Sequence, residues 1–193
     1  MDRTIFDEEH EMFRKAFRTF VEREMVPHRE EWDRAGLVDR SIFTKAGEAG
    51  FIAMAVPESY GGAGVKDFRY NLAIIEELTR ADVYPHGMGL TLHSDVCLPY
   101  FLEYTSDEQQ QRWLPGIASG ELVTAVAMTE PGIGSDLASM STTAQRDGDT
   151  YVINGSKTFI TNGINADLVI VAAKTDPTQR HSGISLIDRK SVV

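Results

Sequence analysis

The residues best suited to chemistry lie in one stretch, residues 127–136, which reads AMTEPGIGSD. Thr129 and Ser135 carry hydroxyl groups that donate or accept hydrogen bonds. Gly132 and Gly134 let the backbone approach a ligand closely and adopt unusual dihedral angles. The stretch follows an apolar run, so we expect its turn at the end of a strand, where a ligand can reach backbone N–H groups. These features predict a ligand-binding loop, with an ordinary turn as the alternative.

Several other kinds of site do not fit the spacing of the residues. The G-x-G-x-x-G pattern of a Rossmann fold fails in this loop, and no helix and second parallel strand are expected after it. The histidines stand alone, so no metal site is expected. No nucleophile–histidine–acid trio follows from the spacing either. Within the loop, we expect Glu130 to bond the nearby backbone and Asp136 to cap the turn.

The apolar pattern divides the chain into two parts. Apolar residues at three- and four-residue spacing predict helices as far as about residue 120. Short apolar runs, partly β-branched, predict strands after that point. Helices followed by strands are typical of an α+β fold. We therefore expect a helical domain over residues 1–120 and a β-domain from residue 121 onward.

One helix start and its end can be predicted in detail. Ser106 followed by Gln109 is typical of a capping box, which opens a helix over residues 107–114. Pro115 is expected to end that helix, because proline removes a backbone donor.

Three short strand predictions follow in the second part. Residues 142–145 and 151–153 are expected to pair as an antiparallel hairpin around Gly148. Residues 157–160 are expected to form another short strand.

Composition restricts the partners. The chain has 193 residues and a net charge of −10, from 19 basic and 29 acidic side chains. This balance argues against nucleic acid and against an anionic membrane as the main partner. Its one cysteine, Cys97, excludes an intrachain disulfide and fits a reducing compartment. No signal-peptide pattern or membrane-span length is visible, so the expected location is cytoplasmic.

The glycine-rich loop resembles the flavin-binding signature of the acyl-CoA dehydrogenase family, whose pattern is close to AMTEPGAGSD. Further matches run in family order along the chain. They lie at residues 56–58 with 60–62, 76–77, 106–109 with 112–115, 120–121, 154–157 and 160–163. The ordered set covers about residues 5–187, and its sequence is most similar to long-chain and general bacterial members of the family.

The resemblance implies a three-part subunit. It has an N-terminal all-α domain, a middle antiparallel β-barrel-like domain and a C-terminal helical bundle. This chain would hold the first domain, residues 1–120, and an incomplete middle domain, residues 121–187, without the bundle. The resemblance further implies FAD as cofactor, acyl-CoA as substrate, an electron-transfer flavoprotein as acceptor, and a homo-oligomer, expected to be a tetramer.

The same resemblance implies site residues by position. Flavin contacts would come from two segments: Val126, Ala127, Met128, Thr129, Gly134 and Ser135, and then Phe159, Ile160 and Thr161. The Thr161 hydroxyl would reach toward flavin N5, and Ser135 would also lie near the acyl-CoA. His181 and Ser182 would contact the CoA portion. The family often has tryptophan where Phe159 stands, so an aromatic face is kept and an indole donor is lost.

No catalytic base is expected within this chain. In the family a glutamate beyond the middle domain removes the α proton of the thioester, while hydride passes from the β-carbon to FAD and trans-2-enoyl-CoA forms. The chain as written is therefore expected to be an inactive fragment of such an enzyme. Residues 188–193 can be encoded by a common sequencing adapter, which predicts an artificial tail.

Two other hypotheses stay open. The chain would be a non-catalytic module that binds flavin or CoA or interacts with other proteins, or it would come from an acyl-CoA oxidase or a nitroalkane-oxidising relative. The presence or absence of a glutamate downstream in the genomic frame would distinguish the non-catalytic module from a dehydrogenase. Turnover with oxygen as electron acceptor would distinguish an oxidase or nitroalkane-oxidising relative from a dehydrogenase.

Overall fold

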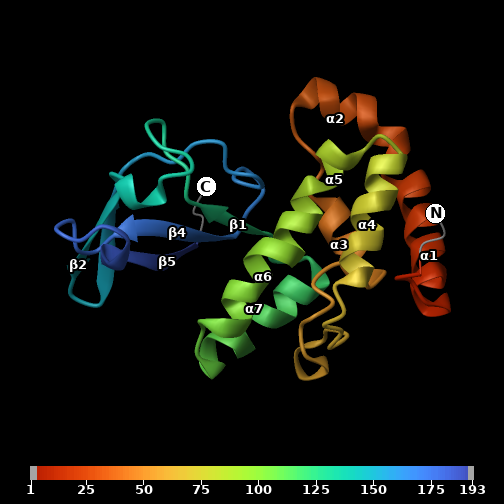
Figure 1. Cartoon of the computed structure of the whole chain (residues 1–193), viewed down its shortest axis with the longest axis horizontal. Coiled ribbons are helices and arrows are strands. Elements are labelled where there is room, and N and C mark those ends of the chain that lie inside the picture. Colours follow the sequence, from red (N-terminus) through yellow and green to blue (C-terminus); the bar gives the residue numbers. More distant parts are fainter. Residues whose placement is uncertain (1–3, 191–193) are drawn as a thin grey trace. The chain divides into compact units, whose positions relative to one another are not determined.

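The structure is a computed structural model that describes residues 4–190. The chain divides into two compact units, the first ending at Leu122 and the second beginning at Val123. Helices make up the first unit, and the β-strands of the described residues all lie in the second (Figure 1). The α+β class predicted from the sequence is therefore confirmed.

The helical unit consists of seven α-helices among the described residues, with short 3-10 and π segments between them. The α-helices are α1 (Glu8–Glu24), α2 (Arg29–Ala35), α3 (Ser41–Glu48), α4 (Arg69–Arg80), α5 (Tyr84–Thr91), α6 (Leu98–Glu103) and α7 (Asp107–Ser119). The connecting segments are η1 (Val26–His28), η2 (Glu58–Tyr60) and the π-helix η3 (Leu92–Cys97).

Helices α1 and α4 pack side by side (Figure 1). Apolar side chains and ion pairs hold them together. Phe17 and Val21 recur four residues apart and are buried, which places the apolar stripe of α1 inward. Beside that stripe, the guanidinium of Arg18 donates to the carboxylate of Glu77 at 2.7 Å. Because Glu77 is only 3% exposed, this pair satisfies a charge that would otherwise be costly to bury.

Helix α7 corrects one prediction. The capping box of Ser106 and Gln109 is confirmed, but the helix runs through Pro115 to Ser119. Leu114 and Ile117 lie three residues apart on one face and are fully buried. Burial of this continuous face offsets the backbone hydrogen bond that proline removes, so the helix does not end there.

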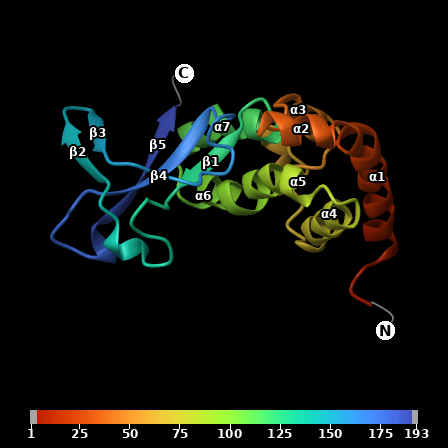
Figure 2. The same ribbon diagram turned by 90° about the horizontal axis from the view of Figure 1, so that it is seen from above.

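The second unit contains a five-stranded sheet. Its strands are β1 (Thr124–Ala127), β2 (Thr143–Asp147), β3 (Thr150–Asn154), β4 (Leu168–Lys174) and β5 (Ile184–Lys190), with the 3-10 turns η4 (Leu137–Ser139) and η5 (His181–Gly183) between strands. Strand β4 is central: it pairs with β1 in parallel and with β5 antiparallel. Figure 2 shows β4 and β5 side by side, with β2 and β3 forming a separate hairpin.

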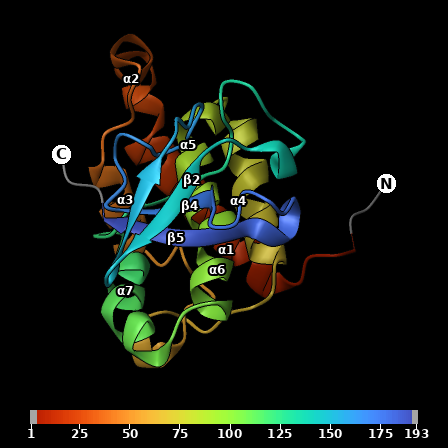
Figure 3. The same ribbon diagram turned by 90° about the vertical axis from the view of Figure 1, so that its left-hand side faces the viewer.

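The β2–β3 hairpin confirms the predicted turn. Gly148 has a φ of 59°, a left-handed conformation that glycine adopts readily. The hairpin meets β4 through one parallel register pair, Thr143 with Lys174, and then diverges from it (Figure 3).

Two details of this unit differ from what was expected. The sheet is mixed rather than antiparallel, because β1 and β2 pair with β4 in parallel; it is not closed into a barrel, which agrees with the incomplete barrel-like domain expected. Residues 157–160 form no strand. Phe159 has a φ of 56°, which is incompatible with an extended chain and breaks any ladder at this position.

Residues 188–190 continue strand β5 and pair with β4. The remaining residues of the predicted tail, 191–193, lie outside the described part of the chain. An artificial origin of the tail stays a prediction about the gene.

Candidate functional site

The two segments predicted to form the flavin walls lie against each other in the second unit. The backbone N–H of Thr158 donates to the carbonyl oxygen of Thr129 at 3.0 Å. The side-chain amide of Asn162 donates to the carbonyl of Thr124 at 3.1 Å. Two segments that are 29 to 38 residues apart in sequence at these bonds therefore lie against each other along β1 and the residues after it.

Glu130 anchors this surface from inside. Its side chain is 3% exposed and accepts four hydrogen bonds. One oxygen accepts from the N–H and the hydroxyl of Ser141, both at 2.7 Å. The other accepts from the Thr142 N–H and the Lys157 ammonium, both at 2.9 Å. Burial by itself would raise the pKa of Glu130, but these donors outweigh it and hold the pKa well below its ordinary value.

Lys157 connects this carboxylate to the flavin loop. Its ammonium, on a side chain 12% exposed, bonds Glu130 and also donates to the carbonyl oxygen of Met128 at 2.9 Å. The ion pair is thus largely out of water and joins residues 128–130 to residue 157. Next to it, Gly155 has a φ of 156°, and a Cβ there would lie 2.2 Å from the Thr142 hydroxyl oxygen. Only glycine fits at this position.

The predicted flavin residues differ in exposure. Ala127 ends β1 and is buried, while Val126, Met128 and Thr129 are half-buried. Gly134 and Ser135 lie exposed on the loop, and no atom lies within 4 Å of a Cβ built at Gly134. The loop therefore leaves its backbone open to a ligand.

Phe159 is the most unusual residue of the second segment. It is 92% exposed and has a left-handed backbone with a φ of 56°. An exposed aromatic ring on a strained backbone is a common sign of a functional position. Ile160 and Thr161 follow it and are half-buried.

The residues predicted to contact CoA lie on the turn η5. His181 and Ser182 are both exposed. Their neighbour Arg180, just before η5, reaches Asp136 of the flavin loop at 3.5 Å. This ion pair is exposed and adds little stability.

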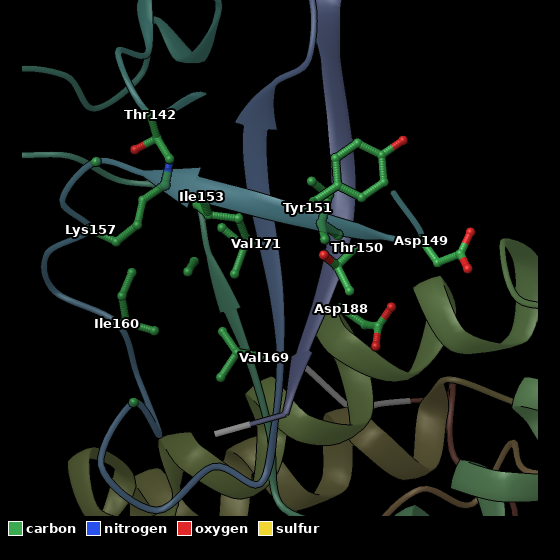
Figure 4. A pocket seen from close by; sticks show the side chains of 14 residues that line it. Thr142, Asp149, Thr150, Tyr151, Ile153, Lys157, Ile160, Val169, Val171 and Asp188 are labelled. Carbon is green, nitrogen blue, oxygen red and sulfur yellow. The ribbon is translucent and has the colours of Figure 1, made fainter. Parts of the chain in front are cut away.

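A broad hollow of about 840 Å³ lies beside the site (Figure 4). Its lining includes the apolar side chains of Ile153, Val169 and Val171, together with Lys157 and Thr142 (Figure 4). Of the predicted flavin residues, Ala127 and Ile160 contribute to the lining.

Residues 4–190 show neither a metal-binding cluster nor a membrane-spanning helix. No group of three or more histidine, cysteine or acidic side chains in this range is arranged to hold a metal ion. None of the helices described combines the length and the apolar character needed to cross a membrane.

Comparison with known proteins identifies two domains of one family in the chain. Residues 7–121 match the family model of the acyl-CoA dehydrogenase N-terminal domain, and residues 125–191 match that of the middle domain. The chain belongs to the acyl-CoA dehydrogenase family.

Individual relatives show how far the likeness extends. The mitochondrial long-chain specific acyl-CoA dehydrogenase of Sus scrofa is 43% identical over 95% of this chain and 43% of its own length. The crystal structure of an acyl-CoA dehydrogenase from Geobacillus kaustophilus is 51% identical, with a TM-score of 0.92, over 98% of this chain and 50% of that one. A glutaryl-CoA dehydrogenase from Mycobacterium smegmatis, solved in complex with FADH2, is 29% identical with a TM-score of 0.85, over 96% and 46%. The chain thus spans about half the length of these relatives.

Sequence reasoning missed Lys157 as part of the site. Residues 154–157 were matched to the family only as a motif, with no role for the lysine. A signal was present, since a glutamate held inside the loop needs a nearby cation once it is buried. Thr142 carried no such signal, because it bonds Glu130 through its backbone N–H, and Ser141 bonds Glu130 through its N–H as well as its hydroxyl.

Proposed function

We propose that this chain carries the flavin-facing surface of an FAD-dependent acyl-CoA dehydrogenase. The whole protein would convert acyl-CoA thioesters to trans-2-enoyl-CoA. The observation that carries the proposal is the junction of residues 124–130 with residues 157–162, which brings both predicted flavin segments onto one surface.

The residues on this surface fit a flavin. Phe159 offers an exposed aromatic face for a planar ring, and Met128 adds apolar area beside the loop. The hydroxyls of Thr129, Ser135 and Thr161 are suited to the polar edge and the ribityl chain. Bound FAD would supply the acceptor for the hydride that leaves the substrate β-carbon.

The chain's own residues would orient the flavin and shield the reacting atoms from water. Hydrogen-bond donors on the loop would stabilise the negative charge that develops on the flavin ring when it is reduced, because they are already in place and need no rearrangement. Met128 and Phe159 would keep water away from the reacting atoms.

Glu130 is not suited to act as the base in this reaction. Its two oxygens are occupied by four donors, and its pKa lies below the ordinary range. We therefore propose that a carboxylate outside residues 4–190 takes the α proton, and that this chain alone does not dehydrogenate acyl-CoA. For the whole protein we further propose an electron-transfer flavoprotein as acceptor, a tetramer, and a cytoplasmic location.

The test is titration of the purified chain with FAD, followed by flavin fluorescence. Because the chain holds only part of the proposed FAD site, weak but saturable binding without thioester-dependent bleaching under anaerobic conditions is the expected result. Absence of FAD binding would contradict the flavin surface. Rapid bleaching with enoyl-CoA formation would instead place a base within this chain. For the whole protein, equal turnover with oxygen and with an artificial acceptor would favour the oxidase.

A further inference from the structure

The ion pair of Glu130 and Lys157 lies at the point where three segments meet. Residues 128–130, 141–142 and 157 are joined there by five hydrogen bonds. Both side chains are largely withdrawn from water, at 3% and 12% exposure. Such a pair is costly to build from isolated charges, and hydrophobic residues often stabilise a fold as well or better. A role beyond stability therefore has to be considered.

The geometry gives Lys157 a direct hold on the flavin loop. Its ammonium bonds the carbonyl oxygen of Met128. The Met128 carbonyl and the Thr129 N–H belong to one planar trans peptide and point in opposite directions. Fixing the carbonyl toward Lys157 therefore turns the Thr129 N–H away from it. The next peptide is also held, since the Thr129 carbonyl accepts from Thr158.

We propose that Glu130 and Lys157 are positioning residues that orient the peptide between Met128 and Thr129 for the flavin. Glu130 keeps the ammonium in place, and Lys157 transmits that position to the Met128 carbonyl. This inference rests on the proposed flavin site. It assigns no contact of either side chain with the cofactor.

The pair also predicts how binding depends on pH. Lys157 is the charged group that contacts Glu130, while Asp149 and Asp188 line the hollow that Lys157 also lines. With the ammonium present, Glu130 stays ionised at neutral and mildly acidic pH. Removing the ammonium leaves three donors on Glu130, the N–H and hydroxyl of Ser141 and the N–H of Thr142, so the carboxylate is expected to stay ionised. The effect of the substitution on flavin binding would then be the same at mildly acidic and neutral pH.

The experiment compares FAD affinity and melting temperature for the full chain and two variants between pH 5 and pH 8. Lys157→Met is expected to raise the FAD dissociation constant about tenfold, the change that follows loss of one charge-assisted hydrogen bond. The loss should be the same at pH 5 and pH 8, because Glu130 keeps three donors in the variant. Lys157→Arg keeps the charge and is expected to recover part of the affinity. Lys174→Met, on β4, is the matched control and should behave as the unchanged chain.

The outcomes separate the two claims. A lower melting temperature for Lys157→Met with unchanged FAD affinity would overturn the positioning role and leave the flavin site standing. Failure of the unchanged chain to bind FAD would overturn the flavin site itself, and the positioning role with it. If Lys157→Met does not fold, Lys157→Arg carries the test: an affinity below that of the unchanged chain at an unchanged melting temperature would support the positioning role, and an equal affinity would count against it. A loss of affinity in Lys174→Met as large as that in Lys157→Met would count against the pair.

Discussion

Individual carboxylates in this protein are held in two opposite ways. Glu130 accepts four hydrogen bonds, and its pKa is lowered despite burial. Asp95 lies half-buried beside a small apolar cavity lined by Phe17 and Ile74, among others, with one hydrogen bond from Asn71. Burial raises the pKa of Asp95 to about 6, and the bond from Asn71 opposes this only in part. The number of donors therefore decides which buried acid stays charged.

Asp95→Asn tests this balance. An acid whose folded pKa is raised binds its proton more tightly in the folded state, so its stabilising contribution is present below pH 4 and is lost as the pH rises through about 6. The substitution should therefore stabilise the helical unit at pH 7 by about 1 kcal/mol, after discount for partial exposure. Thermal unfolding at pH 4 and pH 7 measures the effect. Asp149→Asn, at an exposed site, is the control, and a destabilised Asp95→Asn at pH 7 would contradict the argument.

Thr161→Ala tests a single predicted flavin contact. Loss of the hydroxyl should weaken FAD binding by about 1 kcal/mol, roughly fivefold, without a large change in melting temperature. Fluorescence titration measures it, with Thr150→Ala on the exposed β2–β3 hairpin as control. Equal affinities for both variants would show that Thr161 does not reach the flavin.

At the scale of elements, two glycines distinguish the need for a left-handed backbone from the need for space beside the Cα atom. Gly120 ends α7 with a φ of 76°, and Gly61 follows η2 with a φ of 85°. A Cβ at Gly120 would lie 2.2 Å from the carbonyl oxygen of Phe43, whereas one at Gly61 would meet no atom within 4 Å. Helix α7 therefore depends on glycine for two reasons, and η2 for one.

Alanine at each position measures the difference. Gly61→Ala should cost about 1 kcal/mol, from the left-handed backbone alone. Gly120→Ala should cost more stability than Gly61→Ala, with a total loss on the order of 3 kcal/mol or above, because α3 or α7 must shift. Urea unfolding of both variants gives the comparison. Similar losses at the two sites would mean that the contact with Phe43 relaxes freely.

At the scale of the whole molecule, the chain forms two compact units, and each contains its own buried residues. Leu78, Leu98 and Leu114 are among the fully buried side chains of the first unit. Val123 and Ala173 are fully buried in the second. Units with separate cores often unfold in separate transitions.

A pair of variants tests this separation. Ser106→Ala removes the cap of α7 and should lower the stability of the first unit by about 1 kcal/mol, which shifts the unfolding transition of that unit. Lys157→Met should shift only the unfolding transition of the second unit, because it leaves Glu130 buried without its cation. Differential scanning calorimetry reports both. A single transition that shifts with either substitution would show that the units unfold together.

Much of this protein was determined by its sequence alone, where the signal is local. The periodicity of Phe17 and Val21 predicted a helix, Ser106 with Gln109 predicted a helix start, and Gly148 predicted a hairpin. Each rests on residues within a few positions of one another, so no distant contact is needed. The ordered motifs also placed the chain in its family.

The tertiary structure decided what depends on distant partners. Pro115 lies inside α7 because the helix face around it is buried, and burial was not visible from the proline itself. Strand β1 pairs in parallel with β4 across about 40 residues, so the mixed sheet could not follow from short apolar runs. Lys157 joined the site for the same reason: its ammonium meets Glu130 only after the fold brings residues 27 positions apart into contact. A pattern of residues predicts local dihedral preferences, whereas pairing and burial are settled by the competition of all segments for the same partners.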